Sequence, residues 1–141
     1  MERWVAILLV AVSMLGCGDG GEAVAKRLDF LDSIGKAYQG YNQVHQRAPA
    51  SNAELLEYMR SQASPTQGDL DAAVGLEEGD VVMIWRADLS NFGENGLYVL
   101  GFESGVPSTG GYVLMADGHV QLMTSKDFSE ARMISRAESA H

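Results

Sequence analysis

The sequence predicts an α+β fold, in which a long N-terminal helix packs on an antiparallel meander sheet of three to four strands, with short extra helices. Three observations support this prediction. Apolar residues recur at helical spacing over residues 23–46, whereas the second half of the chain contains short runs rich in β-formers. The pair Asp117-Gly118 separates the last two runs. Helices segregated from a meander in this way are typical of α+β domains.

The first predicted element is an amphipathic helix over residues 23–46. Its apolar side chains recur every three or four residues, which aligns them along one side of a helix. Gly35 and Gly40 each weaken a helix by about 1 kcal/mol relative to Ala, but they could allow close approach to a sheet. The apolar stripe consists of Val24, Leu28, Leu31, Ile34, Tyr38 and Tyr41.

A second helix is predicted over residues 52–62. Ser51 and Glu54 form a capping-box pattern, in which Ser51 is the N-cap and the Glu54 side chain reaches back to it. This helix is expected to bury three apolar side chains on one face. They are Leu55, Leu56 and Met59.

Residues 64–79 are expected to form a connector with one helical turn around residues 70–74, because they contain a proline, three glycines and several acids. Short runs of β-formers then alternate with polar loops at 90–96 and 104–110. The predicted strands cover residues 81–85, 97–103, 112–116 and 119–123.

The last two predicted strands are joined by Asp117-Gly118. Such a pair favours a two-residue type I′ hairpin turn, in which both central residues need a positive φ. After the hairpin, Thr124 or Ser125 can cap a short helix over residues 127–134. Residues 135–141 are expected to fray.

The chain begins with a short apolar run that ends at a cysteine. Residues 4–15 carry no charge, and this run is too short to span a membrane but suits the apolar core of a secretory signal. Gly16-Cys17 follows directly, and the segment resembles the lipobox of bacterial lipoproteins. The resemblance implies a lipoprotein signal peptide over residues 1–16 and a lipid on Cys17.

Three other interpretations of this segment stay open. Cys17 could be an incidental thiol after a plain signal peptidase site, or the apolar run could be an uncleaved anchor. Cys17 could also lie near the start of an ordinary core helix. Four glycines between positions 16 and 21 argue against this last possibility, because each would destabilise a helix that continued past Leu15.

The composition predicts one acidic domain. The chain has 141 residues, a single cysteine and a formal net charge of −9. We expect residues 17–22 to be a flexible tether, residues 23–136 to be the domain and residues 137–141 to be a disordered tail. So negative a charge, with Lys and Arg scattered, argues against nucleic acid as a partner. Membrane contact is expected through the lipid on Cys17.

Two segments carry motifs of a known kind. Residues 31–49 read LDSIGKAYQGYNQVHQRAP, and residues 111–120 read GYVLMADGHV. They resemble the helix and the C-terminal hairpin of the pseudopilin-like proteins of planctomycete bacteria. The resemblance implies a pilin-like globular fold and says little about activity, because the function of that family is largely uncharacterised.

The sequence departs from this family in two places. The family has a histidine ten residues before the Asp-Gly aspartate, and Pro107 stands at that position here. The family's usual N-terminus is a prepilin leader with a long transmembrane helix that allows filament assembly, whereas this chain has a lipobox-like signal. The resemblance therefore implies a lipid-anchored version that keeps the fold and has lost the capacity to form filaments.

Few side chains form a pattern typical of catalysis or metal binding. We expect His45 to lie near the end of the first helix, His119 to be exposed after the hairpin turn, and His141 to be disordered. The acids at 77–80 look more like a solvated loop than a calcium site. No HExxH, CxxC or GxSxG spacing occurs, so we expect no catalytic residues, no metal site and no cofactor. An enzyme would need a cleft in which His45 or His119 lies beside an acid.

The leading hypothesis is a non-enzymatic, lipid-anchored cell-envelope protein on the periplasmic side of the inner or outer membrane. It would contact other envelope proteins, with an exposed sheet edge as one possible surface. The alternative is a small-ligand or carbohydrate-binding envelope module. That module would use Trp85, Tyr98 and the loops at 90–96 and 104–110.

Overall fold

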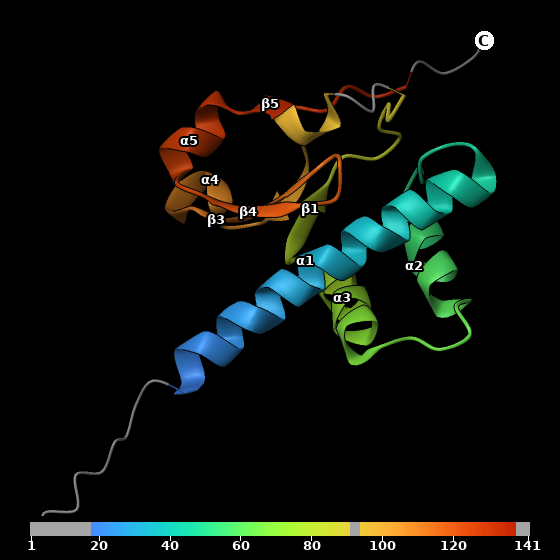
Figure 1. The fold of residues 1–141 in the computed structure, drawn as a ribbon, viewed down its shortest axis with the longest axis horizontal. Helices are drawn as coiled ribbons and strands as arrows, with labels where there is room; N and C mark the ends of the chain where they lie inside the picture. Colours follow the sequence, from blue (N-terminus) through green and yellow to red (C-terminus); the bar gives the residue numbers. More distant parts are fainter. Residues whose placement is uncertain (1–17, 91–93, 138–141) are drawn as a thin grey trace, which may run out of the picture.

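A computed structural model describes residues 18–90 and 94–137, with side chains from Val24 onward. The predicted signal peptide over residues 1–16, Cys17 and residues 138–141 lie outside the described residues. Figure 1 shows the chain as layers around one long helix, α1 (Gly18–His45). The sheet covers one side of α1, and the helices α2 (Asn52–Arg60) and α3 (Gln67–Glu78) cover the other.

The sheet is an antiparallel meander in the order β1-β2-β3-β4, which confirms the predicted α+β class. A fifth strand, β5, was not predicted; it pairs with β2 in parallel, end to end with β1 along the same edge. A short helical turn, η1, precedes β2. The bounds are Val81–Met83 for β1, Asn95–Leu97 for η1, Tyr98–Glu103 for β2, Gly111–Met115 for β3, Val120–Met123 for β4 and Arg132–Met133 for β5.

Apolar side chains are buried on both faces of the sheet. Leu100 and Leu114 point into the core that α1, α2 and α3 share, and both are fully buried. The opposite face, formed by Val99, Val113 and Met115, is covered by α4 (Val106–Thr109) and α5 (Ser125–Glu130). The sequence predicted a cover for the first face alone, because α4 falls in a segment whose proline and glycines read as a loop.

The central part of α1 is buried because it has neighbours on both sides. Leu31, Ile34 and Tyr38 have no exposed surface, whereas Val24, at the start of the predicted stripe, is 39% exposed. In Figure 1 the N-terminal end of α1 extends beyond the sheet. The helix begins earlier than the sequence predicts and includes most of the predicted tether over 17–22. Extending an existing helix costs far less than nucleating one.

Two glycines of α1 mark close approaches, one to the sheet and one to a helix. A Cβ on Gly35 would lie 2.9 Å from Leu114 Cδ1 and 3.6 Å from the Gly118 carbonyl oxygen. The sheet therefore packs against the α1 backbone there, as the sequence suggested. At Gly40, the Tyr58 hydroxyl of α2 occupies the position where a Cβ would lie.

Helix α2 buries the three predicted residues. Its N-cap is Ser51, whose side chain accepts a hydrogen bond from the Glu54 N–H at 3.3 Å. The Glu54 carboxylate, however, accepts from the Ala50 N–H at 2.8 Å and not from Ser51. The predicted reciprocal capping box is therefore wrong in its second half, because Glu54 turns toward other donors.

The predicted connector over 64–79 is wrong, since most of it forms helix α3. Thr66 and Asp69 form a full capping box at its start, a pattern that could have been recognised in the sequence. Gly75 is buried in this helix, and the Phe30 ring of α1 occupies the space where a side chain would lie. Gly75, which the sequence suggested as a helix breaker, instead allows α1 and α3 to pack closely.

The turn between β3 and β4 contains Asp117 and Gly118, but its type differs from the prediction. The Met115 N–H donates to the His119 carbonyl at 2.8 Å, so residues 116–118 form a three-residue connection. Gly118 has a φ of 96°, whereas Asp117 does not have a positive φ. The type I′ prediction is therefore wrong; the pattern is that of a turn followed by a left-handed glycine.

The end of the described chain is paired rather than frayed. Helix α5 ends at Glu130, earlier than predicted, and β5 follows it. The Ser135 carbonyl accepts from the Asp88 N–H at 2.8 Å, and the Ala137 N–H donates to the Arg86 carbonyl at 2.6 Å. The predicted fraying is therefore wrong for residues 135–137, which are held by the segment after β1.

The Tyr38 hydroxyl joins α1 to that same segment. It donates to the Ile84 carbonyl at 2.8 Å and accepts from the Ala87 N–H at 3.1 Å. Its ring stacks on Trp85, with centroids 6.2 Å apart. Burial raises the pKa of Tyr38 to about 12. The hydroxyl thus satisfies two backbone groups of a segment that leaves the sheet.

We expect Tyr38→Phe to lower the free energy of unfolding by about 2 kcal/mol, because a buried N–H and a buried carbonyl lose their partner. Chemical denaturation followed by circular dichroism measures this loss. Tyr98→Phe is the matched control, since Tyr98 packs against the same core and none of the described hydrogen bonds involves its hydroxyl. Equal losses in the two variants would contradict the role given to the Tyr38 hydroxyl.

A second polar cluster fastens the corner between α1 and α2. The Glu54 carboxylate accepts from Arg47 at 2.9 and 3.2 Å, from the Ala50 N–H and from the Tyr41 hydroxyl at 2.9 Å. Arg47 first, and then the Ala50 N–H, lower the pKa of Glu54 to about 2. The carboxylate therefore stays ionised well below the ordinary range for glutamate.

The lowered pKa of Glu54 predicts that the folded protein loses stability in acid. Because the pKa of Glu54 is lower in the folded state, its contribution is complete above about pH 4.5 and is lost as the pH falls toward 2. We expect Glu54→Gln to destabilise the protein by about 1 kcal/mol at pH 7, since the side chain is a third exposed and water screens it. Denaturation at pH 7 and pH 3 should show a smaller difference at pH 3. Glu57→Gln, on the exposed face of α2, is the control.

Candidate functional site

A groove of about 770 Å³ lies where the C-terminal part of α1 meets the segment after β1 and the β3–β4 turn. Its lining comes from four separate parts of the chain, which the fold brings together. Most of the lining side chains are polar. The lining residues are Gln39, Asn42, Gln43, Gln46, Ala87, Asp88, Leu89, Ser90, Asn95, Ala116, Asp117 and Ala137.

One wall of the groove is a row of amide side chains on α1. Gln39, Asn42 and Gln43 share one side of the helix, and Gln46 follows directly after α1 ends at His45. Each amide offers both hydrogen-bond donors and an acceptor. The sequence contained this signal, four amides at helical spacing, but sequence analysis gave it no role.

Asn95 forms part of the opposite wall. Its side chain is 5% exposed, and Nδ2 donates to the Leu89 carbonyl at 3.2 Å. Oδ1 is buried and has no hydrogen-bond partner among the described residues. Exchanging the amide oxygen and nitrogen would not satisfy the residue, because an oxygen would then face the Leu89 carbonyl. Asn95 thus leaves an unused acceptor beside the groove.

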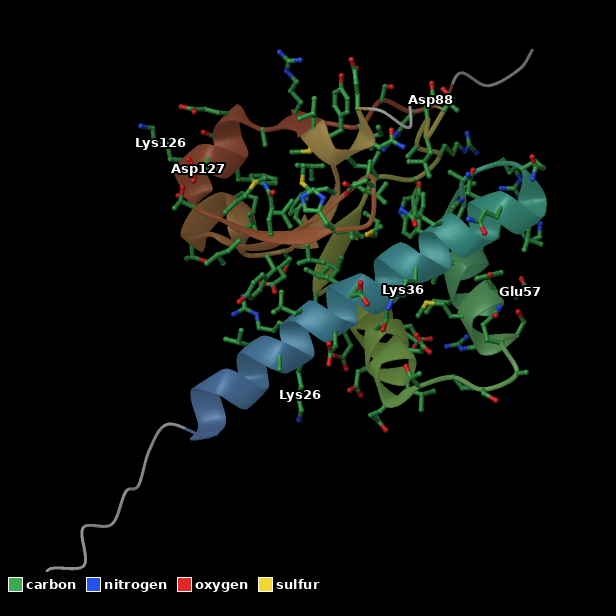
Figure 2. All side chains as sticks on the ribbon, viewed as in Figure 1. Lys26, Lys36, Glu57, Asp88, Lys126 and Asp127 are labelled. Carbon is green, nitrogen blue, oxygen red and sulfur yellow. The ribbon has the colours of Figure 1, made fainter. Side chains whose placement is uncertain are left out.

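Asp88 brings a negative charge to the same place, and Figure 2 labels it on the segment after β1. Its Oδ1 accepts from the Ser90 hydroxyl at 2.5 Å and from the Ser90 N–H at 3.0 Å. The hydroxyl first, and the N–H second, lower the pKa of Asp88. Asp88 is therefore a carboxylate whose orientation is fixed by its own loop.

His119 pairs with an acid that lines the groove. His119 Nδ1 lies 2.5 Å from Asp117 Oδ1, and Nε2 lies 3.2 Å from Gln121 Oε1. Asp117 lines the groove, so the acid-histidine pair that an enzyme would need is present at its edge. Both ring nitrogens are already engaged, however, and no described contact brings a nucleophile to the ring. His45 instead packs on the Tyr41 ring, with centroids 4.1 Å apart.

The two loops suggested for carbohydrate binding border different grooves, and neither Trp85 nor Tyr98 is among the described lining residues of either groove. Trp85 and Tyr98 pack against the core that α1 shares with the sheet. The loop at 90–96 contributes to the groove through Ser90 and Asn95. The loop at 104–110 borders a separate, smaller groove of about 550 Å³ near the N-terminal part of α1.

Among the described residues, no helix is both long and apolar enough to cross a bilayer. In the same part of the chain, no three side chains of the metal-binding types gather in one place. Comparisons with protein families, curated proteins and solved structures give no match for this chain.

The geometry of Asp88 generates a test of the groove's electrostatics. Because the Ser90 hydroxyl is the main cause of the lowered pKa, Ser90→Ala should raise the pKa of Asp88 toward its ordinary value. Carboxyl ¹³C chemical shifts followed against pH measure this change. Ser104→Ala, a serine outside this groove, should leave the pKa of Asp88 unaltered. An unchanged pKa in Ser90→Ala would contradict the assigned hydrogen bond.

Proposed function

We propose that this protein is anchored in the cell envelope by a lipid on Cys17 and acts there by non-covalent binding, without catalysis. The observation that carries the proposal is the position of the groove relative to that cysteine. Cys17 directly precedes α1, and the groove lies along the last two turns of α1. A helix of 28 residues is about 40 Å long. The lipid would hold one end of α1 at the bilayer and present the groove away from it.

The order of the elements supports the proposal of a pilin-like domain. A long helix followed by an antiparallel meander is the arrangement that the motifs at 31–49 and 111–120 led us to expect. Figure 2 shows Lys26 on the N-terminal part of α1 and Asp88 far from it, beyond the sheet. An anchored chain would thus keep its groove accessible to soluble molecules in the periplasm.

The binding role has two candidate forms. Other envelope proteins could pair with β4, because among the described strands it pairs with β3 alone and leaves its outer edge free. A small ligand could occupy the groove instead. The unpaired acceptor of Asn95 favours the small ligand, since it is a polar group that the folded chain leaves unsatisfied beside an open space.

Mass spectrometry of the purified protein tests the anchor. We expect a mature chain that begins at Cys17 and carries the added mass of a lipid, whereas Cys17→Ser should lose both the cleavage and the added mass. Asp19→Asn, two residues further on, is the control and should keep the lipid. An unmodified N-terminus at any other residue, or a Cys17→Ser protein with unchanged mass apart from the substitution, would refute the proposal.

A further inference from the structure

We infer that the groove binds an uncharged, hydroxyl-rich small molecule of the size of a mono- or disaccharide. The inference rests on the proposed binding role but is independent of the lipid on Cys17. It assigns the α1 amide row and Asn95 to ligand recognition. Four observations carry it: the charges of the lining, its hydrogen-bonding groups, the unused acceptor of Asn95 and the volume of the groove.

The charges of the lining argue against an anionic ligand. Among the lining residues that the structure describes there is no Lys or Arg, whereas there are two carboxylates, Asp88 and Asp117. The whole chain has a net charge of −9, which adds to the repulsion of anions. A phosphate or a carboxylate would therefore enter without a cationic partner and would meet like charge.

The two carboxylates are already engaged within the protein, and no third metal-binding side chain among the described residues gathers with them. Asp88 Oδ1 accepts two hydrogen bonds from Ser90, and Asp117 Oδ1 accepts from the His119 N–H and lies beside its ring. Each carboxylate is thus held by donors from its own loop. The larger part of the polar lining is uncharged amide.

The amide row is complementary to hydroxyl groups. A side-chain amide donates through its NH₂ and accepts through its carbonyl, and a hydroxyl group likewise does both. Gln39, Asn42 and Gln43 present such groups at successive positions along one side of α1. A ring with several hydroxyl groups could meet this row at more than one point, which a ligand with a single polar group could not do.

The unpaired acceptor of Asn95 favours a ligand that carries a hydrogen-bond donor. A buried carbonyl without a partner costs about 1–3 kcal/mol. Asn95 Oδ1 is such a carbonyl, and it is buried behind the surface of the groove that Asn95 lines. A donor from outside the chain would reach it through the groove after a small movement of this side chain. A ligand hydroxyl is a donor of this kind.

The volume of the groove fits this class of ligand. At about 770 Å³ it falls within the range of small-molecule sites, roughly 300–1,000 Å³. Among the described lining residues none is aromatic, so the amide side chains are the main polar contacts that these residues offer. We expect weak binding through hydrogen bonds, with a dissociation constant on the order of 1 mM.

The test is an NMR titration of the full chain in a detergent without a sugar headgroup. Glucose and N-acetylglucosamine are the neutral probes, and glucuronate and glucosamine are their anionic and cationic counterparts. We expect saturable shifts of the side-chain NH₂ signals of Asn42, Gln43 and Asn95 with a neutral probe. Binding of glucuronate should be at least about tenfold weaker, because the lining holds only negative charge.

Matched variants separate recognition from folding. Gln43→Ala should weaken binding about fivefold, since one hydrogen-bonding amide of the wall is lost, whereas Gln62→Ala, an exposed glutamine just after α2 and outside the groove, should not. Asn95→Ala should abolish the shifts. Asn52→Ala is its control, because Asn52 also has a buried Oδ1 without a partner but lies outside the groove.

Three results would overturn the inference. The first is tighter binding of glucosamine than of both neutral probes, and the second is saturation of the groove by a short peptide but by no sugar. Either result would leave the proposed binding role intact and would refute only the assignment of a neutral, hydroxyl-rich ligand. The third is equal loss of binding in Asn52→Ala and Asn95→Ala. If no probe of any class shifts the groove signals, the small-ligand form of the binding role is refuted together with the ligand class, and pairing along β4 is the form that remains.

Discussion

The buried hydroxyl of Tyr38 is the constraint on which the groove depends. The segment after β1 leaves the sheet, so several of its backbone groups need partners outside the strands of the meander. Tyr38 satisfies two of them, and the Pro49 carbonyl satisfies a third by accepting from the Arg86 N–H at 2.9 Å. Arg86 itself has a φ of 58°, which is the conformation that redirects the chain there. The same redirected segment then supplies one wall of the groove.

Burial of α1 on two sides explains why its apolar and its polar side chains lie on different sides of the helix. The faces toward the sheet and toward α3 admit only apolar or very small residues, such as Leu31 and Gly35. The exposed strip that is left at the C-terminal end carries the amide row. The helix therefore serves both as the centre of the core and as one wall of the groove, and changes to its buried faces would move that wall.

The predictable part of the fold was the part set by local periodicity. The buried positions of α1 and α2 and the strands of the meander followed from spacing, because neighbours in sequence determine which face is apolar. Helix α3 was missed because Gly75 was taken as a breaker, although Phe30 packs on it. Strand β5 could not be predicted, since a two-residue strand exists only through its bonds to β2. For the site, the amide row was visible in the sequence, but the approach of Asn95 required the fold.

An unsatisfied carbonyl does not by itself mark a functional site, and this chain contains the comparison that shows why. Asn52 and Asn95 have the same arrangement: in each, Nδ2 donates to a backbone carbonyl while Oδ1 is buried without a partner. Asn52 lies where α2 meets α3, away from the groove, so its unpaired oxygen is a cost of packing two helices. Asn95 has the same unpaired oxygen, but its side chain lines an open groove in which most of the polar side chains are amides. The loss of free energy is similar in the two cases, but Asn95 lines an open groove and Asn52 does not, and that difference makes the groove a candidate for binding.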